Sequence, residues 1–249
     1  MMNSETVEKL RSMKLSTMAR YFDKQLSDAT ISTLTFEERF GILVDVEWTM
    51  RRNNRLKRLI KAANYSESGA ALEDIDYAPD RNLDKALIER LSSCDYILKC
   101  RNIILLGATG SGKTYVSNAL GMKANRNFMT VKYIRLPELL ADLAIARSEG
   151  TYKKVLKSYK AVKLLIIDEW LLTPLKDMEA RDLLEIIEGR YHKGSTIFCS
   201  QFDVKGWHEK IGDPTLADAI VDRIVHDAYT IIIQGKESMR KKNGLNKSE

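Results

Sequence analysis

The sequence predicts a three-layer α/β fold around a five-stranded, mostly parallel sheet, preceded by a small all-α N-terminal domain. Short apolar runs alternate with helical patterns through most of the 249-residue chain, and helical crossovers between strands favour parallel pairing. A glycine-rich loop of the phosphate-binding type follows the first of these runs directly. Residues 1–69 contain no proline and only two glycines, Gly41 and Gly69, which favours helices.

The predicted N-terminal domain covers residues 1–69. Thr35 and Glu38 fit a capping box, a reciprocal pair of side-chain to backbone hydrogen bonds that begins a helix. Apolar residues at helical spacing follow, and the pattern ends in a stretch, residues 51–61, that contains six bases and no acid. We expect this domain to bind DNA or a partner protein.

The domain boundary is predicted after the helical region. Residues 70–82 contain Pro79 and scattered acids, so we interpret them as an extended linker. A second domain is expected over residues 83–235, and residues 236–249 form a basic tail.

Each element of the second domain follows from a local pattern. Apolar runs too short for helices predict five strands, at 103–106, 131–134, 164–167, 196–199 and 229–233. Apolar residues at helical spacing predict helices at 83–91, 113–125, 176–192 and 214–225. One further helix is expected to begin at Pro137. Proline suits the first helical turn because it has no N–H, and N–H groups in that turn have no partner within the helix.

Residues 107–114, here called the P-loop, fit the pattern GxxxxGK[ST]. A strand that ends in such a loop and continues as a helix directs backbone N–H groups and the positive end of the helix dipole at phosphate oxygens. We therefore expect a nucleoside triphosphate, although an ordinary strand-to-helix turn is the alternative. Lys113 is expected to contact the β and γ phosphates, and the Thr114 hydroxyl to ligate Mg²⁺. The expected nucleotide-binding residues are Gly107, Ala108, Thr109, Gly110, Ser111, Gly112, Lys113 and Thr114.

Residues 164–169 consist of four apolar residues followed by Asp168 and Glu169. In a P-loop ATPase such a strand ends at the nucleotide, where Asp168 would hold Mg²⁺ and Glu169 would orient and polarise the attacking water. An apolar strand that ends in two acids at the solvent boundary is the alternative interpretation. Its position after a P-loop favours the catalytic one.

Ser200 and Gln201 follow the predicted strand at 196–199. Ligands of parallel sheets bind at the carboxyl ends of the strands, so a polar side chain here is a candidate sensor of the γ-phosphate. The alternative is that both residues simply end the strand.

Several segments together resemble one protein family. The P-loop and residues 164–169, 196–201, 213–224 and 235–241 are similar to segments of the IstB-like ATP-binding proteins, which are AAA+ helper ATPases of bacterial insertion sequences. They also resemble the related replicative helicase loaders of the DnaC type. The resemblance covers nearly the whole chain and implies the AAA+ form of the P-loop fold, with ATP as the nucleotide.

The resemblance also implies roles for two arginines. Arg223 matches the arginine finger that enters the ATP site of a neighbouring subunit, and Arg240 matches a sensor that contacts the nucleotide of its own subunit. A finger acting in trans implies an ATP-dependent homo-oligomer. Trp170 and Gln201 depart from residues common in the relatives, but neither change removes a catalytic group.

Composition limits the function classes. The net charge of +6 is mild, so it is informative only where bases cluster. Cys94, Cys100 and Cys199 have the spacing of neither a disulfide framework nor a zinc site, which favours a reducing compartment. No apolar run approaches the length of a membrane span, and no signal peptide is apparent. We expect a cytoplasmic protein.

Two basic clusters are candidates for contact with DNA phosphates. A solvated helix face is the alternative for each, and the resemblance favours duplex DNA bound with little sequence specificity. The candidates are Arg51, Arg52, Arg55, Lys57, Arg58, Lys61, Lys153, Lys154 and Lys157.

The resulting hypothesis is an Mg²⁺-dependent ATPase that oligomerises on duplex DNA, selects or remodels target DNA and stimulates a partner transposase. A helicase loader acting on single-stranded DNA is the alternative, because the ATP site does not distinguish the two. An ATP-binding scaffold without hydrolysis is disfavoured, since Lys113, Asp168, Glu169 and Arg223 are all present.

Overall fold

The computed structural model describes residues 2–28, 30–235 and 239. The chain divides into two compact units, one ending at Arg58 and one beginning at Leu59. The residues interpreted as a linker therefore belong to the same unit as the sheet. The first unit contains α1 (Met2–Ser12), α2 (Ser16–Ser27), a short 3₁₀ turn and most of α3 (Phe36–Ala63).

Helix α3 begins with the predicted capping box. The Thr35 N–H donates to the Glu38 carboxylate at 2.8 Å, and the Glu38 N–H donates to Oγ1 of Thr35 at 3.3 Å. Farther along α3, the carboxylate of buried Glu47 accepts from the backbone N–H groups of Thr17 and Met18 in the first turn of α2. A carboxylate at a helix N-terminus satisfies N–H groups that have no helical partner, so Glu47 joins α2 to α3.

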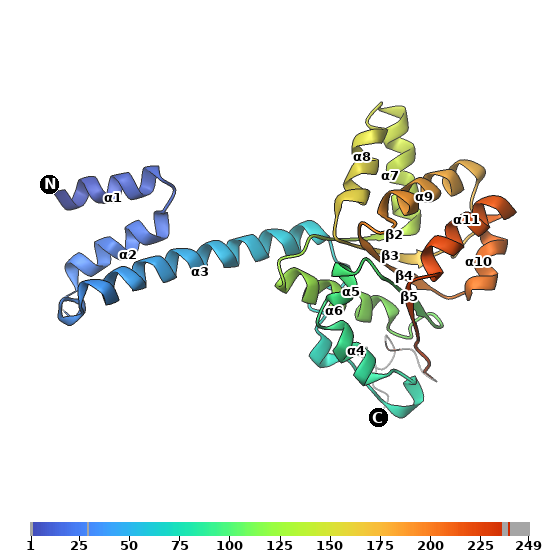
Figure 1. The fold of residues 1–249 in the computed structure, drawn as a ribbon, viewed down its shortest axis with the longest axis horizontal. Helices are drawn as coiled ribbons and strands as arrows, with labels where there is room; N and C mark the ends of the chain where they lie inside the picture. Colours follow the sequence, from blue (N-terminus) through green and yellow to red (C-terminus); the bar gives the residue numbers. More distant parts are fainter. Residues whose placement is uncertain (1, 29, 236–238, 240–249) are drawn as a thin grey trace, which may run out of the picture. The chain divides into compact units, whose positions relative to one another are not determined.

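The second unit is built on five strands: β1 (Asn102–Leu106), β2 (Val131–Arg135), β3 (Leu164–Trp170), β4 (Ser195–Ser200) and β5 (Ala228–Ile232). Their order is β2-β3-β4-β1-β5, and every pairing is parallel (Figure 1). The predicted fold class and all five strands are confirmed, with β3 extending three residues beyond its apolar run.

Helices cover both faces of the sheet (Figure 1). Alternate residues of each strand point to opposite faces, so the buried strands are apolar throughout. Residues Leu164 and Ile166 pack with one layer, whereas Leu165 and Ile167 pack with the other. The first layer contains α4 (Lys85–Leu91), α5 (Asp95–Leu98) and α6 (Lys113–Arg126). The second contains α7 (Leu136–Ser148), α8 (Tyr152–Ala161), α9 (Asp177–Arg190), α10 (Val204–Ile211) and α11 (Pro214–Val225).

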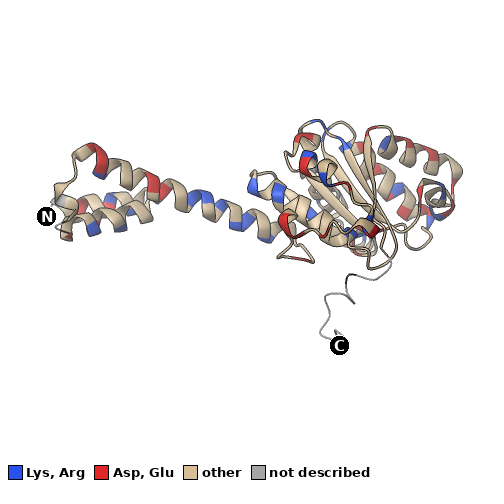
Figure 2. Ribbon diagram, turned by 90° about the horizontal axis from the view of Figure 1, so that it is seen from below, with Lys and Arg blue, Asp and Glu red and all other residues tan. Residues whose placement is uncertain are grey.

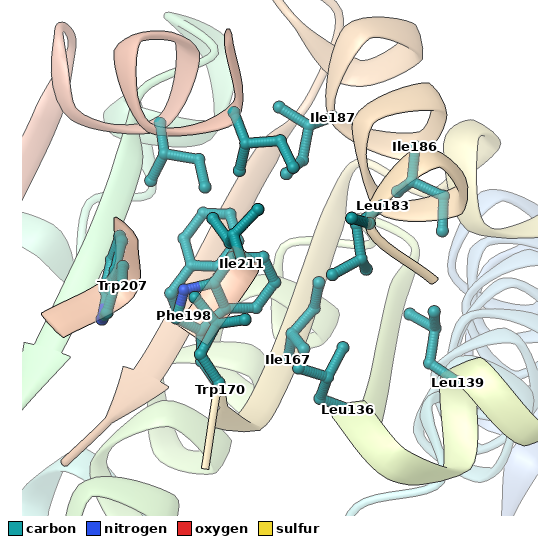
Figure 3. Packing of buried hydrophobic residues seen from close by; sticks show 14 of the residues in the cluster. Leu136, Leu139, Ile167, Trp170, Leu183, Ile186, Ile187, Phe198, Trp207 and Ile211 are labelled. Atoms are coloured by element: carbon teal, nitrogen blue, oxygen red, sulfur yellow. The ribbon is translucent and has the colours of Figure 1, made fainter. Parts of the chain in front are cut away.

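An aromatic cluster lies in the core of the second layer (Figure 3). Trp170 packs edge-on against Phe198 and Trp207, with ring centroids 4.7 and 5.8 Å apart. All three side chains are buried. Because Trp170 directly follows the acidic pair of β3, this packing holds the end of β3 in place.

Gly121 provides a test of the packing between the P-loop helix and the sheet. A Cβ at this position of α6 would lie 2.8 Å from both Ile166 Cδ1 and Tyr65 Cε1. We predict that Gly121→Ala lowers the free energy of unfolding of this unit by about 1–3 kcal/mol, because the added methyl overpacks the interface. Urea denaturation followed by tryptophan fluorescence measures the change.

The matched control is Gly41→Ala in α3. Among the described residues, no atom beyond the local helix backbone lies within 4 Å of a Cβ placed there. The substitution should therefore raise the helicity of α3, since alanine is favoured over glycine in a helix by about 1 kcal/mol. An unchanged urea midpoint for Gly121→Ala would show that Tyr65 and Ile166 move aside freely.

Candidate nucleotide-binding site

The P-loop joins β1 to α6 and requires glycine at particular positions. Gly112 has a φ of +96°, and a Cβ on it would lie 2.8 Å from Nη2 of Arg81. A Cβ on Gly107 would lie 2.3 Å from the backbone oxygen of Ile233. The loop thus passes close to neighbouring chain on both sides, so a side chain at either position would collide with it.

Lys113 begins α6 with its ammonium group folded back onto the loop. Its Nζ donates to the backbone oxygens of Gly107 at 2.7 Å and Ala108 at 2.8 Å. The buried Ser111 hydroxyl finds no hydrogen-bond partner among residues 2–28, 30–235 and 239. A cation and an unpaired hydroxyl in one cradle fit a phosphate group, which accepts hydrogen bonds from both.

A pocket of about 580 Å³ adjoins the P-loop. This volume lies within the range of small-molecule sites, so it can hold a nucleotide. One wall is α6, including Tyr115 and Val116, and the other is the segment predicted as a linker. That segment contributes Asp74, Ile75, Asp76 and Arg81, and Glu67, which precedes it, also lines the pocket.

Arg81 fastens this segment to the P-loop, and sequence reasoning missed it. The buried guanidinium donates to the backbone oxygens of Ser111 at 2.7 Å and Asp76 at 2.6 Å. The backbone oxygen of Arg81 accepts from the Gln234 N–H beyond β5. No local pattern marks Arg81, because its partner in the P-loop is the backbone oxygen of Ser111, which only the folded chain brings near.

Asp168 lies beside the P-loop, as the sequence predicts. Its Oδ2 accepts from the Thr114 hydroxyl at 2.6 Å, and its Oδ1 accepts from the Glu169 N–H at 2.8 Å. A bulge in β3 shifts the register, so that Ile167 pairs with Phe198 and Trp170 pairs with Ser200. A hydroxyl and a carboxylate in contact are hard oxygen donors, and this pair fits Mg²⁺.

Glu169 lies at the same edge of the sheet with a strained backbone. Its φ is +54°, an uncommon conformation for a residue other than glycine and one that recurs at functional sites. The carboxylate is 3.7 Å from Nε of Arg135, which also pairs with Glu138 at 3.1 Å. The side chain is one-third exposed, so it is accessible to water.

Ser200 and Gln201 separate in the structure. The buried Ser200 hydroxyl donates to the backbone oxygen of Trp170 and accepts from Nε1 of Trp207 and the Phe202 N–H, so its hydrogen bonds hold the aromatic cluster. Gln201 is exposed, and its Oε1 accepts from the Thr109 hydroxyl of the P-loop at 2.9 Å. Of the two side chains, that of Gln201 contacts the P-loop and that of Ser200 contacts the aromatic cluster.

Arg223 lies at the end of the sheet opposite to the P-loop, near the amino ends of the strands. Its guanidinium donates to Glu188 at 3.0 Å and to the backbone oxygen of Ala219 at 2.8 Å. The next residue, Ile224, accepts from the side chain of Asn102 at the amino end of β1. Five residues of strand, roughly 16 Å at about 3.3 Å per residue, separate this end from the P-loop.

Arg240 lies outside the described residues. Its neighbour Met239 is described, and the Met239 N–H donates to the backbone oxygen of Gly110 at 2.9 Å. Met239 also lines the pocket. The chain therefore reaches the P-loop one residue before Arg240.

The candidate DNA-binding residues are exposed on two helices. Figure 2 shows bases along the second half of α3. Arg51 is partly engaged there, since it donates to Glu47 at 2.7 Å and to the Lys14 backbone oxygen at 2.7 Å. Arg52 lies over the ring of Trp48 at 5.0 Å. The other exposed bases on α3 are Arg55, Lys57, Arg58 and Lys61, and those on α8 are Lys153, Lys154 and Lys157.

Within the part of the chain that the structure describes, no helix is both long enough and apolar enough to cross a membrane.

Solved structures share the fold of the second unit. The structure of DnaI aligns with a TM-score of 0.60 at 22% identity, covering 74% of this chain and all of DnaI. The DnaC helicase loader aligns with a TM-score of 0.57 at 18% identity, covering 66% of this chain and 97% of the loader. At these identities the likeness is one of fold, the P-loop AAA+ sandwich.

Sequence comparison extends over nearly the whole chain. An insertion sequence ATP-binding protein of Sinorhizobium fredii is 41% identical over 241 residues, which cover 97% of this chain and 98% of the relative. One from Pseudomonas fluorescens is 39% identical over 201 residues, which cover 81% and 87% of the two chains. The family model described as IstB-like ATP binding protein matches residues 8–247. With its P-loop, acidic β3 strand and nucleotide-sized pocket, the chain belongs to the IstB-like ATP-binding proteins.

Proposed function

We propose that this protein is an Mg²⁺-dependent helper ATPase of DNA transposition that assembles on duplex DNA, selects or remodels the target and stimulates a partner transposase. The main observation behind this proposal is that Lys113, Thr114 and Asp168 lie together at the carboxyl ends of the strands, beside a pocket of about 580 Å³. Membership in a family of insertion sequence ATP-binding proteins supports the role in transposition.

The proposed chemistry divides among a few residues. Lys113 leaves the loop carbonyls and binds the β and γ phosphates, while Thr114 and Asp168 hold Mg²⁺. When bound, Mg²⁺ neutralises charge on the phosphate oxygens. Glu169 orients the attacking water and accepts its proton. The contact of Gln201 with Thr109 supports a role for Gln201 in sensing the γ-phosphate.

The position of Arg223 supports a finger that acts in trans. Arg223 lies near the amino ends of the strands, whereas the P-loop follows their carboxyl ends, so Arg223 does not reach the P-loop of its own chain. A second subunit that placed the amino ends of its strands against the P-loop of the first would bring its Arg223 guanidinium to the γ-phosphate. The proposal for Arg240 as a sensor in cis is supported by the Met239 contact with Gly110.

The exposed bases support DNA binding through phosphates. Lys and Arg contacts to phosphate are insensitive to sequence and weaken as salt concentration rises. Repetition of the basic helices around a homo-oligomer would multiply weak contacts into stable binding.

A helicase loader remains the alternative, and the likeness that supports it is one of fold alone. Competition between labelled duplex and single-stranded DNA of equal length distinguishes the two functions. Preferential binding to duplex supports the transposition helper, and preferential binding to the single strand supports the loader.

Glu169→Gln tests the catalytic assignment. The amide cannot accept the proton of water, so we predict that ATP hydrolysis in the presence of DNA falls by about 10²- to 10⁴-fold while ATP affinity is kept. A phosphate-release assay and calorimetry measure the two quantities. Glu185→Gln, an exposed carboxylate of α9 paired with Lys160, is the control. Undiminished hydrolysis by Glu169→Gln would rule out Glu169 as the base.

Arg223→Ala tests action in trans. Loss of the finger should lower hydrolysis by roughly 10³- to 10⁵-fold without loss of nucleotide binding. A mixture of Arg223→Ala with Lys113→Ala should regain activity, because one variant supplies an intact ATP site and the other supplies the finger. Exposed Arg181→Ala on α9 serves as the control for loss of a surface charge. A mixture as inactive as its separate components would contradict a finger in trans.

A further inference from the structure

Tyr133 on β2 contacts the carboxylate of Asp168, the proposed metal-binding residue. Its side chain is buried, and its hydroxyl donates to Oδ2 of Asp168 at 3.0 Å. That oxygen also accepts from the Thr114 hydroxyl at 2.6 Å, and the other oxygen accepts from the Glu169 N–H. Of these three donors, Tyr133 is the one that comes from outside the P-loop and β3.

The Tyr133 hydroxyl also interacts with Ser66. Burial raises the pKa of Tyr133 above its usual value, and a hydrogen bond with Ser66 opposes this rise. Ser66 Oγ in turn accepts from the side-chain amide of Asn118 in α6 at 2.9 Å. A chain of hydrogen bonds therefore runs from the Asn118 amide to Ser66, from Ser66 to Tyr133, and from Tyr133 to the Asp168 carboxylate.

Ser66 belongs to the segment that follows the end of α3. The preceding residue, Tyr65, donates its hydroxyl to Oδ1 of Asn125 in α6 at 2.7 Å. Asn64, just after the last residue of α3, has a φ of +57°, so the backbone turns sharply there. Two adjacent side chains thus attach the end of α3 to the P-loop helix, and one of them, Ser66, also hydrogen-bonds with Tyr133.

We propose that Tyr133 is a positioning residue that orients the Asp168 carboxylate for Mg²⁺ and links it, through Ser66, to the segment in which α3 ends. The inference rests on the proposed function, because it takes Asp168 as the metal-binding group. Side chains that orient a metal ligand typically change metal affinity by roughly 10- to 100-fold when they are removed. The link makes the α3 junction sensitive to the occupancy of the metal site.

The first experiment is an Mg²⁺ titration of Tyr133→Phe, which removes one oxygen and keeps the ring. Binding of a fluorescent non-hydrolysable ATP analogue is measured in EDTA and at increasing free Mg²⁺. We expect equal affinity in EDTA and a half-saturating Mg²⁺ concentration raised roughly tenfold or more. A folded Tyr133→Phe protein with the half-saturation of the wild type would overturn the positioning role.

Tyr159→Phe is the matched control. Tyr159 is another buried tyrosine, and it donates to a carboxylate, Asp142, at 2.6 Å in the α7 and α8 pair. The same substitution there should lower stability without moving the Mg²⁺ titration, which separates positioning from general support of the fold. Wild-type protein whose analogue binding ignores Mg²⁺ would instead refute the proposed metal site itself.

The second experiment tests the link with Ser66→Ala, a substitution at an exposed residue that leaves the core intact. Amide hydrogen exchange is followed by mass spectrometry for the peptide that contains Ser66. In the wild type, the analogue with Mg²⁺ should slow exchange in this peptide relative to the analogue in EDTA. The difference should vanish in Ser66→Ala and in Tyr133→Phe and persist in Tyr159→Phe. Protection that persists in both hydroxyl variants would overturn the link.

Discussion

The site depends on the parallel pairing of β1, β3 and β4. Parallel strands end at a common edge, so the loop after β1 and the acids at the end of β3 meet there although many residues separate them in the chain. Strand β4 lies between them and supplies Gln201 at the same edge. The bulge in β3 and the packing of Trp170 then set the direction in which Asp168 and Glu169 leave the sheet.

The same edge is also where the second unit connects to the helix that begins in the first. Residues after α3 line the pocket beside the P-loop, and Arg81 among them fastens the P-loop. Ser66 hydrogen-bonds with Tyr133, which donates to Asp168. Nucleotide and metal would therefore bind against residues that continue directly from α3. This connection offers a physical route by which ATP could affect a helix that carries exposed bases, without requiring a contact between distant surfaces.

Much of the fold was predictable because its signals are local. All five strands occur where short apolar runs predict them, and the P-loop helix begins at Lys113 as expected. The capping box of α3 is present because its four residues carry both donors and acceptors. The division between units was less predictable. Residues 70–82 look like a linker in sequence, yet they pack as a wall of the pocket, because the Arg81 guanidinium donates to the backbone oxygen of Ser111, which is remote in the chain.

By itself, the sequence determined the strands, the P-loop and the acidic pair, since each depends on the types and spacing of residues within one short stretch of the chain. Only the tertiary structure decided the strand order, the separation of Arg223 from its own P-loop, and the different surroundings of Ser200 and Gln201. It also brought Tyr133 to the Asp168 carboxylate and Ser66 to Tyr133. These relationships depend on which surfaces pack together in three dimensions, and no short stretch of sequence contains that information.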